Sequence, residues 1–368
     1  MSSTPLQRLS ALGQSVWVDN LSRATNRDGH LQSLIDDYSV AGATSNPTIF
    51  EKAMASGDAY DEQLRELLEH TTDTREIFWA LAQQDIQDAC DVFRPVFDAS
   101  LGRDGYVSLE VDPGLAYDTF TTYSEAMRLH KQVERPNLMV KIPATKPGLA
   151  AIEDVIAKGK SINVTLIFSL RRYAEVAESY VRGLERLVAA GGDPSVVASV
   201  ASFFVSRIDT EADKRLEALG EWDELEGKLA IANAKLAYAH YLDVFSGPRW
   251  DYLAGKGATP QRVLWASTSV KNPAYPDTLY VEELLGPDTV NTMPEETIRA
   301  YQDHGAPEPR LQRDLEGAHV ILRELADAGV DYDDLTDTLE REGVEKFSAA
   351  FDELMATLGA KRHSLAPA

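Results

Sequence analysis

The chain has 368 residues, 44% of them hydrophobic, so it can bury a large core in one barrel-sized domain or in two smaller ones. Its formal net charge of -23 argues against a nucleic-acid surface or an anionic membrane as a partner, although a local group of cations can still bind an anionic substrate. The single cysteine, Cys90, excludes an intrachain disulfide framework.

The N-terminal segment 1–12 lacks the basic start and apolar core of a signal peptide. No stretch approaches the ~20 apolar residues that a membrane span needs, so we expect a cytoplasmic protein without a membrane partner. The seven histidines are scattered, with no spacing typical of a metal site. We therefore expect no metal.

Short apolar runs rich in β-branched residues alternate with longer amphipathic stretches, an order typical of a parallel sheet covered by helices. Strands are predicted at residues 15–18, 42–44, 106–110, 138–142, 161–166, 196–200, 262–265 and 289–291. Apolar spacing of three and four residues predicts helices at 72–97, 118–133, 148–158, 170–190 and 210–244. Eight strands with helices between them predict an α/β fold, a (β/α)8 TIM barrel with additional helices.

We expect one barrel domain over residues 1–368. Segment 50–103 contains more helical sequence than one crossover needs, so it predicts extra helices after the second strand. Pro294, followed by two acids, is typical of a helix start, and a C-terminal helical segment is expected at about 311–361. Segment 245–260, with three glycines and two prolines, predicts a loop, and 362–368 predicts a loose tail.

Lys141 lies inside the apolar strand predicted at 138–142. Burial removes hydration from an ammonium ion and favours the neutral amine, which can attack a carbonyl and form a Schiff base. The alternative is a lysine whose ammonium group reaches solvent from the strand end.

Other polar residues fall at or near the C-terminal ends of the predicted strands, where TIM barrels carry their active sites. Each of them alone is better explained by a structural role in a turn, a helix cap or a plain strand position. Their common edge of the barrel favours a shared site. They are Asp19, Thr44, Asn46, Asn163 and Thr165.

Glu110 interrupts an apolar strand, where an unpaired carboxylate is costly. Lys141 on the adjacent predicted strand is its expected partner. The pair is either a structural salt bridge or a carboxyl group that moves protons while a Schiff base forms, and the residues alone leave both open.

Three segments together resemble the signature motifs of the transaldolase family: GATSNPTIF at 42–50, VKIPAT at 140–145 and INVTLIF at 162–168. The resemblance extends from VWVD at 16–19 to at least Asn291, and the length is similar to that of the larger bacterial members. It implies a barrel of the class I aldolase type. We expect a stand-alone chain, without the phosphoglucose isomerase domain that some members carry.

The resemblance implies a cofactor-independent transfer of a dihydroxyacetone unit in the non-oxidative pentose phosphate pathway. The donor would be sedoheptulose 7-phosphate or fructose 6-phosphate, and the acceptor glyceraldehyde 3-phosphate or erythrose 4-phosphate. Lys141 would attack the C2 ketone, and Asp19 would take the C4 hydroxyl proton. Glu110 would shuttle protons through a water positioned by Thr165. Thr44, Asn46 and Asn163 would lie at the hydroxyls of the bound fragment.

The segment SFFVSR at 202–207 resembles the family segment that supplies a serine, here Ser202, to the sugar and an arginine, here Arg207, to the phosphate. Phe203 and Ser206 stand where a proline and a glycine are expected, which leaves the local backbone shape open.

A second phosphate contact is expected near SVKN at 269–272, where many relatives have a serine-aromatic-arginine run. Ser269 would lie at the sugar phosphate. Lys271 is either a point charge on the phosphate or a solvated loop lysine.

A lyase similar to fructose 6-phosphate aldolase is the nearest alternative, because it uses the same lysine but releases free dihydroxyacetone. Phe204 argues against it: the aldolases are expected to have a tyrosine there, and phenylalanine cannot protonate an enamine. A non-catalytic barrel and a deoxyribose phosphate aldolase are further alternatives, the second of which does not explain the motif at 44–47. Sugar phosphates are the expected partners of a monomer or homodimer.

Overall fold

The computed structural model describes residues 3–55, 57–220 and 224–365. Its centre is a closed barrel of parallel strands that follow one another in chain order, with β1 hydrogen-bonded to β8. The predicted TIM barrel is confirmed. The strands are β1 Gln14–Val18, β2 Val40–Thr44, β3 Val107–Glu110, β4 Leu138–Pro143, β5 Ile162–Ile167, β6 Ser199–Phe204, β7 Arg262–Ala266 and β8 Thr289–Met293.

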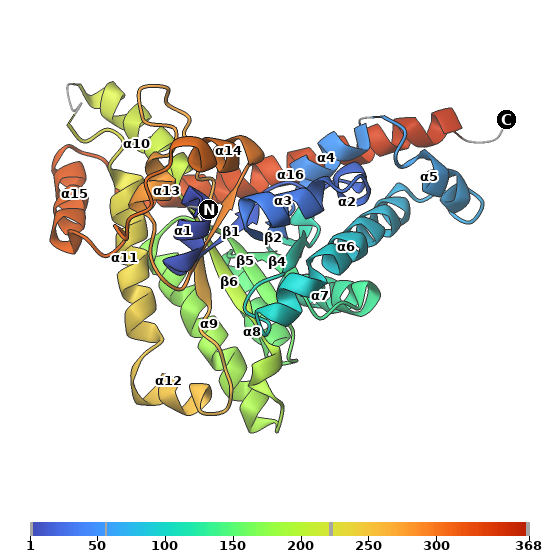
Figure 1. Cartoon of the computed structure of the whole chain (residues 1–368), viewed down its shortest axis with the longest axis horizontal. Coiled ribbons are helices and arrows are strands. Elements are labelled where there is room, and N and C mark those ends of the chain that lie inside the picture. The colour runs from blue at the N-terminus through green and yellow to red at the C-terminus, as the bar shows by residue number, and fades with distance from the viewer. Residues whose placement is uncertain (1–2, 56, 221–223, 366–368) are drawn as a thin grey trace.

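Helices surround the barrel (Figure 1). Those of the first half are α1 Pro5–Ala11, α2 Arg23–Arg27, α3 His30–Tyr38, α4 Pro47–Ala55, α5 Asp61–Leu68, α6 Thr74–Ala99, α7 Thr119–Val133 and α8 Lys146–Ile156. Those of the second half are α9 Leu170–Ala189, α10 Ser206–Leu219, α11 Leu229–Val244, α12 Gly247–Ala254, α13 Leu279–Glu283, α14 Glu295–His304, α15 Leu315–Asp327 and α16 Tyr332–Leu365. Two short 3-10 helices are η1 Pro113–Leu115 and η2 Pro194–Val196.

Side-chain caps are present at the N-termini of α8 and α9, the helices that follow β4 and β5. The Thr145 hydroxyl accepts a hydrogen bond from the Gly148 amide at the start of α8, and the Ser169 hydroxyl accepts one from the Arg172 amide at the start of α9. Such caps satisfy amides that lack a partner in a first helical turn. The chain therefore turns away soon after β4 and β5, which leaves the last residues of these strands at the barrel edge.

The sixth strand begins later than predicted. We expected it at 196–200, but residues Pro194–Val196 form η2, in which the Asp193 side chain accepts a hydrogen bond from the Ser195 amide. The strand is therefore Ser199–Phe204, and its pairing with β5 starts at Ile162 and Ser199. The shift places Ser202 and Phe204 inside the strand instead of beyond it.

Three other boundary predictions were wrong. The helix expected at 210–244 is two helices, because α10 ends at Gly220, whose φ of 128° suits glycine. The loop expected at 245–260 contains α12, which begins with a proline in its first turn and buries Trp250 and Leu253. The tail expected at 362–368 is helical to Leu365, and 366–368 lie outside the described residues.

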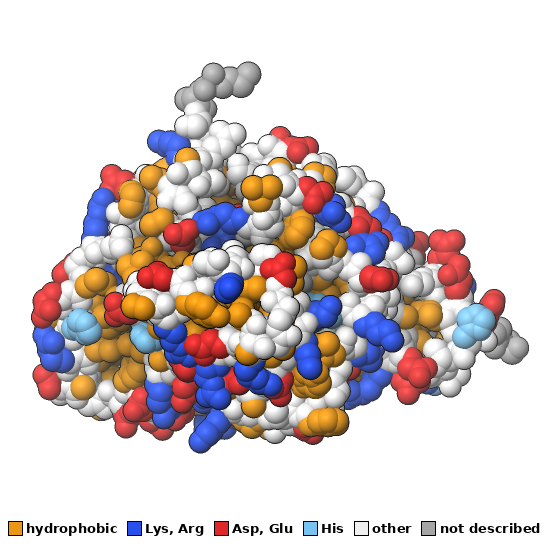
Figure 2. Space-filling view, turned by 90° about the horizontal axis from the view of Figure 1, so that it is seen from below, with side chains coloured by type: hydrophobic (Ala, Val, Ile, Leu, Met, Phe, Trp, Pro, Cys, Tyr) orange, Lys and Arg blue, Asp and Glu red, His pale blue; other side chains and the backbone are white. Residues whose placement is uncertain are grey.

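The helices α4, α5 and α6 lie between β2 and β3, in the region where extra helices were expected. The last helix, α16, drawn in red, crosses beside the barrel and contacts α4, α6, α10 and β5 (Figure 1). Acidic and basic side chains are intermixed over the face seen in Figure 2. In the described part of the chain, no helix has the length and apolar character needed to cross a membrane.

Candidate active site

A cavity of about 330 Å³ opens at the C-terminal edge of the barrel. Side chains at or just beyond the ends of seven strands reach it, together with residues from the flanking helices. This is the edge at which TIM barrels place their chemistry. Most of the predicted site residues line this cavity: Asp19, Thr44, Asn46, Lys141, Thr165, Ser202, Phe204, Arg207, Ser269 and Lys271.

Lys141 and Glu110 lie side by side in the register of β3 and β4. Their side chains are 6% and 3% exposed, and 3.4 Å separates Lys141 Nζ from Glu110 Oε2. Lys141 Nζ also donates a hydrogen bond of 3.1 Å to the carbonyl oxygen of Ser45. The amine is therefore held between a carboxylate and a backbone acceptor in a cavity wall.

Burial raises the pKa of Glu110, and the adjacent Lys141 opposes this shift. Neither carboxylate oxygen makes a hydrogen bond of normal geometry with another described residue, and the buried Thr165 hydroxyl likewise has no hydrogen-bond partner among them. A carboxyl group with a raised pKa beside an amine is suited to exchange protons with it.

Asp19 follows β1 and forms a hydrogen-bonded chain with two threonines. The Thr44 hydroxyl donates to Asp19 Oδ1 at 2.7 Å, and the Thr292 hydroxyl is 2.7 Å from the Thr44 oxygen. Because Thr44 uses its proton on Asp19, Thr292 must be the donor in the second bond. Burial raises the pKa of Asp19, while Lys141, the Thr44 bond and Arg207 oppose the shift.

Asn163 lies behind the cavity wall and does not line it. It is fully buried, its Nδ2 donates to Ser108 Oγ at 3.0 Å, and its Oδ1 accepts from Ser202 Oγ at 2.6 Å. Asn46 does line the cavity, and its Oδ1 accepts from the Ile49 amide in the first turn of α4. Its amide nitrogen is then the group able to donate to a ligand.

Cations gather at the outer part of the cavity. Arg207, at the start of α10, lies 5.1 Å from the centre of the Phe204 ring, and no described carboxylate forms an ion pair with it. Burial lowers its pKa, and Asp19 and Glu342 oppose this. Lys271 Nζ donates to Ser269 Oγ at 2.6 Å in an exposed loop. A half-buried guanidinium without an ion pair to a described carboxylate is suited to a phosphate.

The sequence reasoning missed several lining residues. Thr48 and Lys52 lie one helical turn apart on α4, which begins within the motif at 42–50 and continues past it. Because residues four apart share one face of a helix, this spacing could have identified both. Glu296 is the second residue of α14, near the end of β8. Phe347 comes from α16, and no pattern in the sequence links it to the motifs.

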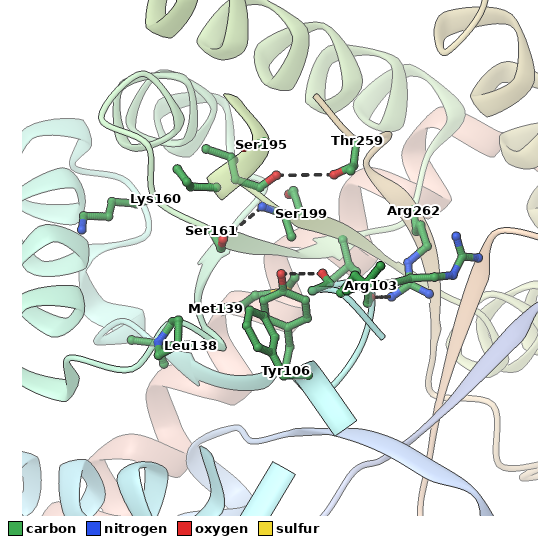
Figure 3. Close-up of a pocket in the computed structure, with 18 of the residues that line it drawn as sticks. Arg103, Tyr106, Leu138, Met139, Lys160, Ser161, Ser195, Ser199, Thr259 and Arg262 are labelled. Atoms are coloured by element: carbon green, nitrogen blue, oxygen red, sulfur yellow. Dashed lines mark hydrogen bonds between the residues drawn. The ribbon is translucent and has the colours of Figure 1, made fainter. Parts of the chain in front are cut away.

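A larger cavity, of about 1010 Å³, lies at the opposite end of the barrel, where several strands begin. Arg103 and Arg262 lie on one side of it and Lys160 on the other (Figure 3). Its arginines already have acidic partners, with Arg103 paired to Asp288, Arg135 to Asp91 and Arg262 to Asp104. The smaller cavity is lined by the Lys141 amine and by Asp19, whose pKa is raised, and Glu110 lies next to the amine. It is therefore the candidate active site.

Comparison with known proteins identifies the family of the chain. The family model described as Transaldolase/Fructose-6-phosphate aldolase matches residues 16–358. A transaldolase of Acidothermus cellulolyticus is 54% identical over 96% of both chains, and one of Thermobifida fusca is 52% identical over 96% of both. Transaldolase 1 of Streptomyces coelicolor is 51% identical over 96% of this chain and 93% of its own. The chain therefore belongs to the transaldolase/fructose-6-phosphate aldolase family of enzymes.

Proposed function

We propose that this enzyme transfers a dihydroxyacetone unit between sugar phosphates through a Schiff base on Lys141. The donor is a ketose phosphate, sedoheptulose 7-phosphate or fructose 6-phosphate. The acceptor is glyceraldehyde 3-phosphate or erythrose 4-phosphate, as in the non-oxidative pentose phosphate pathway. The observation that carries the proposal is the buried Lys141 amine, which lines the cavity and lies 3.4 Å from Glu110.

In the first step, the neutral Lys141 amine attacks the C2 ketone of the donor. Glu110 exchanges protons with the carbinolamine, which loses water to give a protonated imine. The buried polar atoms of Glu110 and Thr165 that lack hydrogen bonds support a bridging water between them as the proton carrier. The same pair acts in reverse when the product imine is hydrolysed.

In the second step, Asp19 removes the proton of the C4 hydroxyl and the C3–C4 bond breaks. The bonding electrons move into the protonated imine, which becomes an enamine, and the aldose leaves. The enamine carbon then attacks the aldehyde of the acceptor, and Asp19 returns its proton to the new hydroxyl group. The raised pKa of Asp19 suits a group that must bind and release one proton in each cycle.

The remaining residues bind the substrate. Ser202 and Asn46 line the cavity beside Lys141 and are assigned to the fragment's hydroxyls, with Thr44 close by. Asn163 acts from behind the wall, where its Oδ1 accepts a hydrogen bond from the Ser202 hydroxyl and so orients it. Arg207 is assigned to the phosphate, supported by Ser269 and Lys271.

The test is intact-mass spectrometry after incubation with fructose 6-phosphate and borohydride, which reduces an imine to a stable adduct. We expect a three-carbon adduct that maps to Lys141. Addition of erythrose 4-phosphate before the borohydride should prevent this adduct from being trapped. Lys141→Ala should form no adduct, whereas Lys271→Ala, which removes another lysine of the cavity, should retain it. An adduct on a different lysine, or none in the wild type, would contradict the proposal.

A further inference from the structure

One aromatic side chain of the candidate active site comes from the far C-terminal part of the chain. Phe347 lies near the middle of α16, is 5% exposed and lines the cavity. The centre of its ring is 5.9 Å from Lys141 Nζ. Much of the remaining wall consists of hydroxyl, amide and charged groups, so Phe347 is one of the few large apolar side chains of the wall, with Ile49 and Phe204.

The position of Phe347 is set by neighbours one turn away on each side. At Gly343, a Cβ atom would lie 3.0 Å from Leu166 Cδ2, so α16 lies so close to the end of β5 that a larger residue would have to displace the Leu166 side chain. Phe351 meets Phe78 of α6 edge to face, with 5.3 Å between ring centres. The Glu340 carboxylate also pairs with Arg172 of α9 at 3.0 Å. These contacts hold α16 to the barrel on both sides of Phe347.

A transferase that works through an enamine has to protect it from water. If the enamine carbon takes up a proton, the protonated imine is restored, and water adds to its carbon. The carbinolamine then collapses, free dihydroxyacetone leaves and the lysine amine is regenerated. If the acceptor aldehyde reacts first, a carbon–carbon bond forms instead. The partition between these routes depends on water near the Schiff base nitrogen and carbon.

We propose that Phe347 is the residue that keeps water from the Lys141 Schiff base, and so determines that the three-carbon unit is transferred and not released. This inference rests on the proposed function. The ring lies on the side of Lys141 that α16 covers, and an aromatic ring near a protonated imine also stabilises its positive charge. Anchoring by Gly343 and Phe351 makes this cover part of the resting fold.

The experiment compares two rates, both from fructose 6-phosphate. One is the steady release of dihydroxyacetone without an acceptor, and the other is transfer to erythrose 4-phosphate. In Phe347→Ala we expect the ratio of release to transfer to rise about tenfold or more, because water gains access to the imine. Phe347→Leu, which keeps apolar bulk, should show a smaller rise. The fraction of enzyme that borohydride traps without an acceptor should be highest in the wild type, lower in Phe347→Leu and lowest in Phe347→Ala.

Phe351→Ala is the matched control, because it lies one turn further along the same helix and does not line the cavity. It should lower the melting temperature but raise the ratio far less than Phe347→Ala does, because the Phe347 ring is still present and the Glu340–Arg172 ion pair and the Gly343 contact still hold α16. An unchanged ratio in a folded Phe347→Ala that still forms the Lys141 adduct would overturn the inference. So would an equal rise in Phe351→Ala, since that would indicate general loosening of α16.

Two further results distinguish failure of this inference from misfolding of the variant and from failure of the proposed function. If Phe347→Ala does not fold, Phe347→Leu carries the test, and a ratio equal to that of the wild type overturns the inference. If the wild type forms no adduct on Lys141, the proposed function itself fails, and this is seen before any variant is compared.

Discussion

Lys141 Nζ lies 3.4 Å from Glu110 Oε2, and the two residues stand opposite each other in the register of β4 and β3. Both side chains are almost completely buried. A pair of this kind is costly to bury, because two charges lose their hydration. The proposed function assigns proton exchange to this pair, and this leads to the first prediction.

Glu110→Gln keeps the shape of the side chain but removes its proton exchange. We expect the transfer rate to fall about 10²-fold, the usual contribution of a positioned acid or base. Because burial raises the pKa of Glu110, the variant should also lose the change in rate with pH that the ionisation of this carboxyl produces. The pH dependence of kcat/KM measures both effects.

Glu296→Gln is the control for this prediction. Glu296 lines the same cavity but comes from α14, and it has no assigned role in proton transfer. A rate loss in this variant as large as that in Glu110→Gln would argue against the assignment to Glu110.

Arg207→Ala should weaken binding of the substrate phosphate. A hydrogen bond to a charged group contributes about 1.5–3 kcal/mol, so KM for fructose 6-phosphate should rise roughly 10- to 100-fold. Lys271→Ala should have a smaller effect, since its amine lies in an exposed loop. Steady-state kinetics with phosphorylated and unphosphorylated ketoses check this, because a role at the phosphate predicts no loss with the unphosphorylated substrate.

The buried carboxyl group of Asp209 should make the free energy of unfolding depend on pH. It is buried, accepts hydrogen bonds from the Ala230 amide and the Tyr280 hydroxyl, and burial raises its pKa from 3.8 to about 7. Between about pH 4 and 7 the unfolded chain has lost this proton while the folded protein keeps it. The free energy of unfolding should therefore fall as pH rises through this window, by an amount on the order of a few kcal/mol.

Asp209→Asn removes this titration. Urea unfolding from pH 4 to pH 9 should show a shallower fall in the free energy of unfolding for the variant than for the wild type, and the difference between the two should stop changing above the pKa. Parallel curves for the two proteins across the window would contradict the assignment.

Gly42→Ala tests the close packing beneath the GATSNPTIF segment. A Cβ atom at Gly42 would lie 2.6 Å from the Trp17 indole, and both residues are in buried strands. Overpacking of this kind costs about 1–3 kcal/mol. The control is Gly359→Ala in α16, where the nearest atom is 4.0 Å away and alanine favours the helix. Urea midpoints should fall for the first variant and stay level or rise for the second.

Strand order and most of the lining residues of the candidate site could be predicted from the sequence, because strand-forming runs and the polar residues that end them are local patterns. The errors were also local in origin. The start of β6 depends on whether Pro194 begins a 3-10 turn or a strand, and its composition permits both. Segment 245–260 has turn-forming residues, yet Pro248 suits the first turn of α12 equally well.

By itself the sequence determined the barrel, the buried Lys141 and the ring of polar residues at strand ends. Apolar periodicity and the residues that follow each strand are local signals, because they depend only on residues close together in the sequence. Only the tertiary structure decided that Asn163 stands behind the cavity and not in its wall, because this depends on the hydrogen bonds from Ser202 and to Ser108. It also decided that Phe347 faces Lys141. Packing brings α16 to the barrel from a distant part of the chain, and no local pattern encodes such a contact.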